Sequence, residues 1–182
     1  MSTRRPALPG DPDPATTVER MIRVDHAGEY GAARIYAGQL AVLGRSASAP
    51  ALREMAAQEH QHRDAFARLV GERQVRPTAL LPLWHVVGFA LGAATAALGE
   101  RAAMACTVAI EEAIDTHYAG QIANLDDSEA ALRDTIAQFR DDELRHRDAA
   151  LAHGARETPG YRLLYTAIKA GCRLAIAASE RI

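Results

Sequence analysis

Apolar residues recur at steps of three and four along most of the chain, which is the pattern of helices with one buried face. Glycine, proline and serine interrupt the pattern; Gly44 is expected to stop one helix, and Ser48 and Ser128 to cap the starts of two others. Four long helices and a last one are predicted, at residues 16–43, 51–71, 100–125, 128–153 and 159–179. The last helix is expected to pack inward through Leu163, Leu164, Ala167, Ile168, Cys172, Ala175 and Ile176.

In the four long helices, carboxylates and imidazoles occupy positions on stripes that are otherwise apolar. Asp25 and Glu29 interrupt the first stripe one turn apart, and Glu59 and His62 fall on the second. An acid that faces a protein core is costly unless it is paired or bound to a metal. Six residues placed in this way are the predicted metal ligands: Glu29, Glu59, His62, Glu111, Glu143 and His146.

The spacing of these residues repeats along the chain. Two Glu-x-x-His pairs begin at Glu59 and Glu143, and positions three apart lie on one face of a helix. Glu29 precedes the first pair by 30 residues and Glu111 precedes the second by 32, which suits two antiparallel helices and their loop. A Glu from each of two helices and a Glu-x-x-His from two others are the ligands of a di-iron or di-manganese carboxylate bundle.

The expected fold is therefore all-α: a ferritin-like four-helix bundle with an apolar crossover helix and an extra C-terminal helix. Two irons suit the ligands, with Glu59 and Glu143 as bridges, Glu29 and His62 on one iron, and Glu111 and His146 on the other. Spacing alone barely separates Glu111 from its neighbour Glu112, and the apolar stripe favours Glu111. A ligating histidine usually hydrogen-bonds a second carboxylate, for which Asp142 is the candidate at His62 and Asp25 a second one.

Residues 77–99 contain no Asp, Glu, Lys or Arg, and they lie where a bundle of two hairpins needs a crossover. Pro82, His85 and several glycines make the segment irregular. We interpret it as a membrane-associated element that lies in the interface, with Trp84 at the boundary. Two alternatives stay open: a membrane-spanning helix, and a core helix that the protein itself covers.

Length and composition indicate one domain, residues 15–182, after a flexible tail of residues 1–14 that contains four prolines. A net charge of -2 and a pI of about 6.4 exclude a basic surface for nucleic acid. Cys106 and Cys172 lie far apart and outside any C-x-x-C pair, which favours buried thiols and a reducing compartment. Neither a signal peptide nor a transit peptide is expected.

The chain resembles the demethoxyubiquinone hydroxylase family, the di-iron monooxygenases of ubiquinone biosynthesis. The resemblance covers nearly everything after the tail. The matching stretches are IRVDHAGEYGA (22–32), RIYAGQ (34–39), QE-x-x-H (58–62), VRPT (75–78), PLW (82–84), GFALG (88–92), MACTVA (104–109), EE (111–112), FRD (139–141), E-x-x-H (143–146), AGCR (170–173) and SER (179–181).

The resemblance implies hydroxylation of a prenylated demethoxybenzoquinol (demethoxyubiquinol) with dioxygen at two irons. Tyr118 and His117 are the catalytic candidates, to orient the ring or relay a proton. The family also implies reduced nicotinamide, such as NADH, as electron source. No G-x-G-x-x-G fingerprint is present, so Arg20, Arg173 and Arg181 are the candidates for its phosphates.

For localisation and partners, the resemblance implies peripheral association with the cytoplasmic face of a bacterial inner membrane, or the mitochondrial inner-membrane equivalent. It also implies a lipid-binding partner protein, and a homo-oligomer is a further possibility. Two rival functions remain. A soluble ferritin-like peroxidase or iron-storage protein would share the six ligands but have no use for residues 77–99, and a structural helical adaptor would hold no metal.

Overall fold

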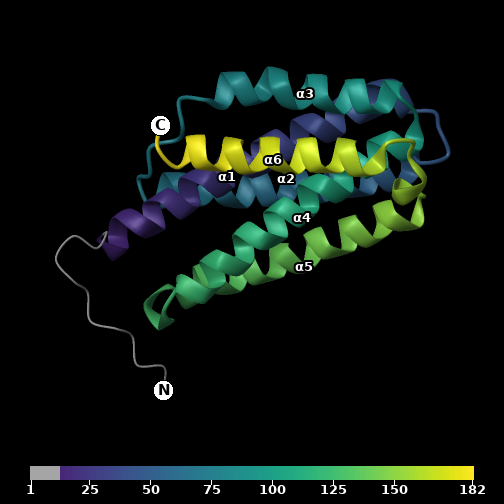
Figure 1. Cartoon of the computed structure of the whole chain (residues 1–182). Helices are drawn as coiled ribbons and strands as arrows, with labels where there is room; N and C mark the ends of the chain where they lie inside the picture. The colour runs from purple at the N-terminus through teal and green to yellow at the C-terminus, as the bar shows by residue number, and fades with distance from the viewer. Residues whose placement is uncertain (1–12) are drawn as a thin grey trace.

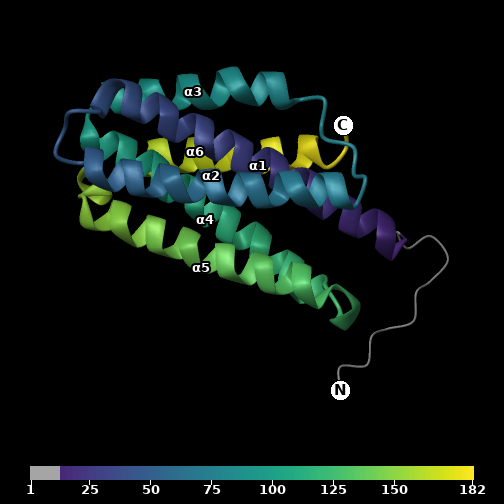
Figure 2. The same ribbon diagram turned by 180° about the vertical axis from the view of Figure 1, so that it is seen from behind.

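The computed structural model describes residues 13–182, which form six α-helices and two short 3-10 turns, with no strand among them. The predicted all-α fold is confirmed. In both views α3 forms the outer edge on one side and α5 the edge on the other, with the remaining helices between them (Figures 1 and 2). The elements are α1 (Pro14–Leu43), α2 (Ala49–Glu72), α3 (Leu81–Ala97), α4 (Glu100–Asn124), η1 (Asp127–Glu129), α5 (Ala130–Ala152), η2 (Ala155–Glu157) and α6 (Tyr161–Ser179).

Helix α1 begins at Pro14, inside the stretch predicted as a tail; residues 1–12 lie outside the described part of the chain. Proline fits the first turn because no backbone N–H is needed there. The Asp13 side chain accepts a hydrogen bond from the Ala15 amide and caps the helix. The helix therefore begins before the predicted start at residue 16, because a proline fits the first turn of a helix although it breaks the interior.

Ser48 lies at the N-cap position of α2, as predicted, but its side chain makes no capping hydrogen bond; the predicted cap at Ser128 is wrong. Ser48 adopts a helical conformation, and its amide and hydroxyl instead donate to Glu100 at the start of α4. Ser128 lies within η1, which Asp126 caps by accepting from the Ser128 amide at 3.0 Å. The partner of Ser48 is 52 residues away in the sequence, so the local cap signal could not predict it, whereas Ser128 bonds within its own turn.

Helix α3 packs along α1 and leaves its other face exposed (Figure 1). The exposed fraction is 64% at Val86 and 74% at Leu98, just after the helix, so the alternative of a core helix covered by the chain itself is wrong. Between residues 13 and 182, no helix combines the length and the apolar character that a membrane crossing needs. Association with a membrane surface stays a prediction.

Helix α6 contacts α4 and α1 through a narrower face than predicted. Leu163 is 79% exposed and Ala167 is also exposed, whereas Ile168 is buried and Cys172 half-buried. Residues 164, 168 and 172 are one turn apart and define the inward direction, so position 163 points away from it. Cys106 and Cys172 are free thiols, as predicted.

Candidate metal centre

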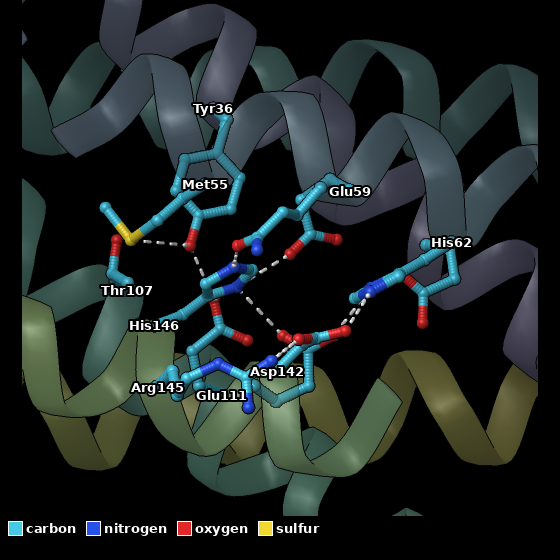
Figure 3. A network of polar contacts seen from close by, with 12 residues as sticks. Tyr36, Met55, Glu59, His62, Thr107, Glu111, Asp142, Arg145 and His146 are labelled. Carbon is cyan, nitrogen blue, oxygen red and sulfur yellow. Dashed lines mark hydrogen bonds and ion pairs between the residues drawn. The ribbon is translucent and has the colours of Figure 1, made fainter. Parts of the chain in front are cut away.

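Four helices bring the six predicted ligands to one place in the core. Figure 3 shows Glu59, His62, Glu111 and His146 of this cluster. Each of the six residues is at most 2% exposed. Helix α1 supplies Glu29, α2 supplies Glu59 and His62, α4 supplies Glu111, and α5 supplies Glu143 and His146. Helix periodicity directs each residue inward, and the two-hairpin topology makes the four helices face one another.

The six residues form two overlapping groups of four. Glu29 and His62 belong to the first group and Glu111 and His146 to the second, while both groups share Glu59 and Glu143. In each group the candidate ligand atoms all lie within 4.8 Å of one another. This arrangement suits two cations with two shared carboxylates, as the sequence predicts for a dinuclear site.

The donor atoms themselves fit divalent cations. Both carboxylate oxygens of Glu59 are buried without a hydrogen-bond partner, and so is one oxygen of each of Glu29, Glu111 and Glu143. The pKa values of Glu59 and Glu111 are raised well above the usual range of a glutamate. Burial is the largest cause, and the negative charge of neighbouring carboxylates is the second. So many buried acids are costly without positive charge among them, and two divalent iron or manganese ions would supply it.

His62 is oriented by a carboxylate outside the cluster, as predicted. Its Nε2 lies 3.1 Å from Asp142 Oδ2, while Nδ1 lies 3.1 Å from Glu143 Oε1 and 3.6 Å from Glu29 Oε2. Burial opposes the charged ring, but hydrogen bonds with Glu143 and Glu29 outweigh it and raise the pKa of His62 to about 10. Nδ1 is thus the nitrogen that faces the cluster, and Asp142 fixes the ring from the other side.

His146 has an equivalent partner that the sequence reasoning missed. Its Nε2 lies 2.6 Å from the amide oxygen of Gln58, and its Nδ1 lies 3.2 Å from both Glu59 and Glu143. The sequence does contain an indication of this partner: Gln58 immediately precedes the first Glu-x-x-His, just as Asp142 immediately precedes the second. The residue before each motif therefore supports the histidine of the other motif.

Two buried tyrosines donate hydrogen bonds to cluster carboxylates. Tyr36 Oη donates to Glu111 Oε1 at 2.6 Å, and Tyr118 Oη donates to Glu29. Burial, with the negative charge of these acids, raises the pKa of both phenols, so both stay protonated donors. Tyr118 is one of the predicted catalytic residues, whereas Tyr36 is not among the sequence-based candidates.

Asp25 does not support a histidine of the metal cluster, and that part of the prediction is wrong. Asp25 Oδ1 lies 3.2 Å from His117 Nε2 and accepts from Gln121 Nε2 at 2.8 Å. Burial raises the pKa of Asp25 to about 6, although contacts with His117 and Gln121 oppose the shift. Asp25 lies one turn before Glu29 but faces the part of α4 that carries His117.

A polar cavity of about 400 Å³ lies over this part of the structure, between α1 and α4. His117, Gln121 and Arg20 line it, together with Glu180 from the C-terminus. Arg173 and Arg181 are exposed and line neither this cavity nor the apolar one described next. The structure therefore does not bring the three predicted nicotinamide-binding arginines into one site.

An apolar cavity of about 420 Å³ has walls from α1, α3, α4 and α6, and two of these helices, α1 and α4, also carry cluster residues. Its lining includes Gly28 and Ile110, which directly precede the cluster residues Glu29 and Glu111. Trp84 of α3 also lines the cavity, and its Nε1 donates to Ser179 Oγ at 3.0 Å. The cavity can hold an apolar or aromatic ligand.

Glu112 is separated from the cluster, which resolves the ambiguity left by spacing. Its carboxylate accepts from Lys169 at 2.9 Å and from Tyr165, both on α6, and this pairing lowers the pKa of Glu112 against the effect of burial. Glu111 points into the core instead. The two neighbouring acids therefore have different partners, one in the cluster and one at the α4–α6 contact.

The similarity to known proteins extends over nearly all of the helical part of the chain. The family model described as "Ubiquinone biosynthesis protein COQ7" matches residues 16–179. The chain is 59% identical over 181 residues to the 3-demethoxyubiquinol 3-hydroxylase of Rhodospirillum rubrum, covering 99% of this chain and 85% of that one. It is 53% identical over 169 residues to the human NADPH-dependent 3-demethoxyubiquinone 3-hydroxylase, mitochondrial, covering 91% and 78%. It is 42% identical over 185 residues to the mitochondrial 5-demethoxyubiquinone hydroxylase of Saccharomyces cerevisiae, covering 92% and 79%. The chain belongs to the COQ7 family of ubiquinone biosynthesis proteins.

Proposed function

We propose that this protein is a di-iron monooxygenase that hydroxylates prenylated demethoxyubiquinol with dioxygen in ubiquinone biosynthesis. The observation that carries the proposal is the buried dinuclear cluster, with an apolar cavity that shares α1 and α4 with it, in a chain whose relatives are named for this hydroxylation. Glu29, Glu59, His62, Glu111, Glu143 and His146 would hold the two irons, and the bound metal supplies the activation of dioxygen.

The residues around the cluster have separate tasks in this proposal. The apolar cavity binds the quinol and excludes water from the ring. Tyr118 holds the carboxylate of Glu29 by its hydrogen bond, and Tyr36 does the same for Glu111. His117 is 18% exposed and contacts buried Asp25, so it can take a proton from the polar cavity and hold it beside the centre.

The reductant is proposed to be a reduced nicotinamide, because several relatives are named NADPH-dependent. Arg20 is the best of the three predicted arginines, since it lines the polar cavity together with His117. Arg173 and Arg181 would take part only through the exposed surface. Replacing Arg20 with glutamine should raise the KM for the nicotinamide and leave iron content unchanged.

We further propose that α3 rests on a membrane surface, the cytoplasmic face of a bacterial inner membrane or its mitochondrial equivalent. Support comes from the exposed apolar side chains of this helix, among them Leu83 (49% exposed) and Val86 (64%). The product and substrate are lipid-soluble quinols, so access from a membrane is chemically reasonable. A lipid-binding partner protein and a homo-oligomer stay predictions.

The rival function is a soluble ferritin-like peroxidase or iron store. Such a protein would need the six ligands but neither the apolar cavity nor the exposed apolar face of α3. The decisive experiment extracts quinones from cells that lack this protein. We expect demethoxyubiquinone to accumulate, and expression of the wild-type chain, but not of the Glu143→Gln variant, to restore ubiquinone. Normal ubiquinone in the deleted cells would overturn the proposed function.

A further inference from the structure

The apolar cavity reaches the protein surface between α3 and α6. Among its lining residues in the described part of the chain, three are exposed: Val87 on α3, and Ala167 and Gly171 on α6. The lining residues that come from α1 and α4 are all buried or half-buried. Helices α1 and α4 therefore form the floor of the cavity, and its opening lies between the other two walls.

The opening exists because α3 and α6 do not pack against each other. Helix α3 packs on α1 and α4, and α6 packs on the same two helices, but over residues 81–97 and 161–179 the two backbones make no close approach. The end of α6 lies beside the start of α3 (Figure 1). There Trp84 Nε1 donates to Ser179 Oγ at 3.0 Å, and the Ala79 amide donates to the Ile182 carbonyl oxygen at 3.2 Å. These contacts join the two helices at one end and leave them apart along the rest.

Both edges of the opening are apolar. On α3, Leu83 lies one turn before Val87, and the two are 49% and 44% exposed. On α6, Leu163 lies one turn before Ala167 and is 79% exposed. The cavity lining itself contains no charged side chain. A ligand with a long apolar tail can therefore pass from the surface into the cavity without meeting a charge.

Small residues keep the α6 edge of the opening low. Ala167 and Gly171 are one turn apart and lie on the same face of the helix. A Cβ atom built at Gly171 meets no atom within 4 Å beyond its own helix and chain neighbours. A larger side chain at this position would fit the fold and would project into the opening.

We propose that apolar ligands enter the cavity sideways, between α3 and α6, through an opening bordered by Val87, Ala167 and Gly171. This inference rests on the proposed function for the identity of the ligand, a lipid-soluble quinol. The side chains at these three positions set the width of the opening, and so the rates at which the ligand enters and leaves. The buried lining on α1 and α4 sets how tightly the ligand is held.

The rates can be measured by stopped-flow fluorescence, because Trp84 is the chain's only tryptophan and lines the cavity. A ubiquinone with a short prenyl tail should quench it on binding to the full chain. A side chain that obstructs the opening slows entrance and exit alike, so kon and koff fall together and Kd is unchanged. In Gly171→Leu and in Ala167→Leu we expect both rate constants to fall about tenfold or more.

Two further variants complete the test. Val87→Ala lowers the opposite edge and should raise both rate constants. Ala170→Leu is the matched control, because Ala170 is an exposed neighbour of Gly171 on α6 that does not line the cavity. It should leave both rate constants unchanged. Leucine is a good helix former, so none of the leucine variants should lower the Tm.

The decisive quantity is koff in the two variants that narrow the opening. A koff that falls together with kon supports the opening between α3 and α6. A koff that stays the same or rises would mean that these positions hold the bound ligand or have no part in access, and the proposal would be wrong. A control that slows as much as Gly171→Leu would also overturn it. The proposed function fails separately, if cells that lack the protein keep normal ubiquinone, whatever the rates of binding.

Discussion

Asp142 Oδ2 lies 3.1 Å from His62 Nε2, across the contact between α5 and α2. The opposite nitrogen of the same ring faces Glu143 and Glu29. The carboxylate therefore fixes both the orientation of the imidazole and the nitrogen that carries its proton. Gln58 has the same relation to His146, so each hairpin orients the histidine of the other.

Replacing Asp142 with asparagine should weaken iron binding while the fold persists. The loss of the charged partner lowers the basicity of His62, and changes of this type reduce metal affinity about 10- to 100-fold. The measurement is iron per chain after dialysis against a graded chelator. Asp141→Asn is the control, because Asp141 is its exposed neighbour and should retain wild-type affinity. Equal retention in both variants would show that Asp142 has no part in iron binding.

Replacing Gln58 with leucine should have a similar effect at the other metal position. Without the amide oxygen at 2.6 Å, the ring of His146 loses its hydrogen-bond partner on the side away from the carboxylate cluster. We expect one iron to exchange faster than the other in stopped-flow chelation. Gln61→Leu, at an exposed position on the same helix, should leave both exchange phases unchanged. The interpretation would be wrong if the two leucine variants behaved alike.

Neighbouring acids on α4 should respond differently to the same substitution. Glu111→Gln removes a buried oxygen donor and should lower iron content and hydroxylation together. Glu112→Gln breaks a half-exposed ion pair with Lys169, so it should cost only about 0–1 kcal/mol of unfolding free energy and leave the iron in place. The measurements are the iron content of both variants and their free energies of unfolding in urea. Iron loss in the second variant alone would reverse the assignment of these residues.

The metal-free protein should become less stable as pH rises above about 5. Burial first raises the pKa of Glu59, Glu111 and Glu143 above the ordinary value of 4.5, so the folded chain holds more protons than the unfolded one. Stability then falls as pH rises from that value through the folded-state pKa values. His62, with its pKa raised to about 10, acts in the same direction above pH 6.5. His146, with a pKa lowered by burial, acts in the opposite direction.

The measurement for this prediction is the Tm of metal-free and iron-loaded protein across about pH 5 to 8. We expect the Tm of the metal-free form to fall with pH, and the stabilisation by iron to grow, because bound metal replaces the protons. A Tm of the metal-free form that rises over the same range would contradict the assigned pKa shifts.

Replacing Val86 with glutamate should reduce association with lipid vesicles without changing stability. The side chain is 64% exposed on α3, so the charge meets water in the free protein but opposes insertion into an apolar layer. Cosedimentation with vesicles of phosphatidylethanolamine and phosphatidylglycerol is the measurement. Val42→Glu, 48% exposed near the end of α1, is the control. If wild-type protein stays in the supernatant, the membrane proposal for α3 is wrong.

The sequence by itself determined the helices, the inward faces of the four bundle helices and the six residues that meet in the core. Helix periodicity is local, so Glu29 on its apolar stripe and the paired Glu-x-x-His motifs could be assigned without coordinates. Their duplication also predicted that two hairpins would bring them together. The apolar stripe favoured Glu111 over Glu112 as a ligand. In the structure Glu111 is buried in the core, and Glu112 pairs with Lys169 outside the cluster.

Only the tertiary structure decided the contacts between helices that are far apart in the sequence. Gln58 reaches His146 and Asp25 reaches His117 because of how α2 meets α5 and α1 meets α4. Likewise, Gly28 and Gly92 look alike in the sequence, yet one borders a cavity and the other lies against a backbone. Local pattern fixes which side of a helix is buried, but the residue on the facing helix depends on the packing of the whole bundle.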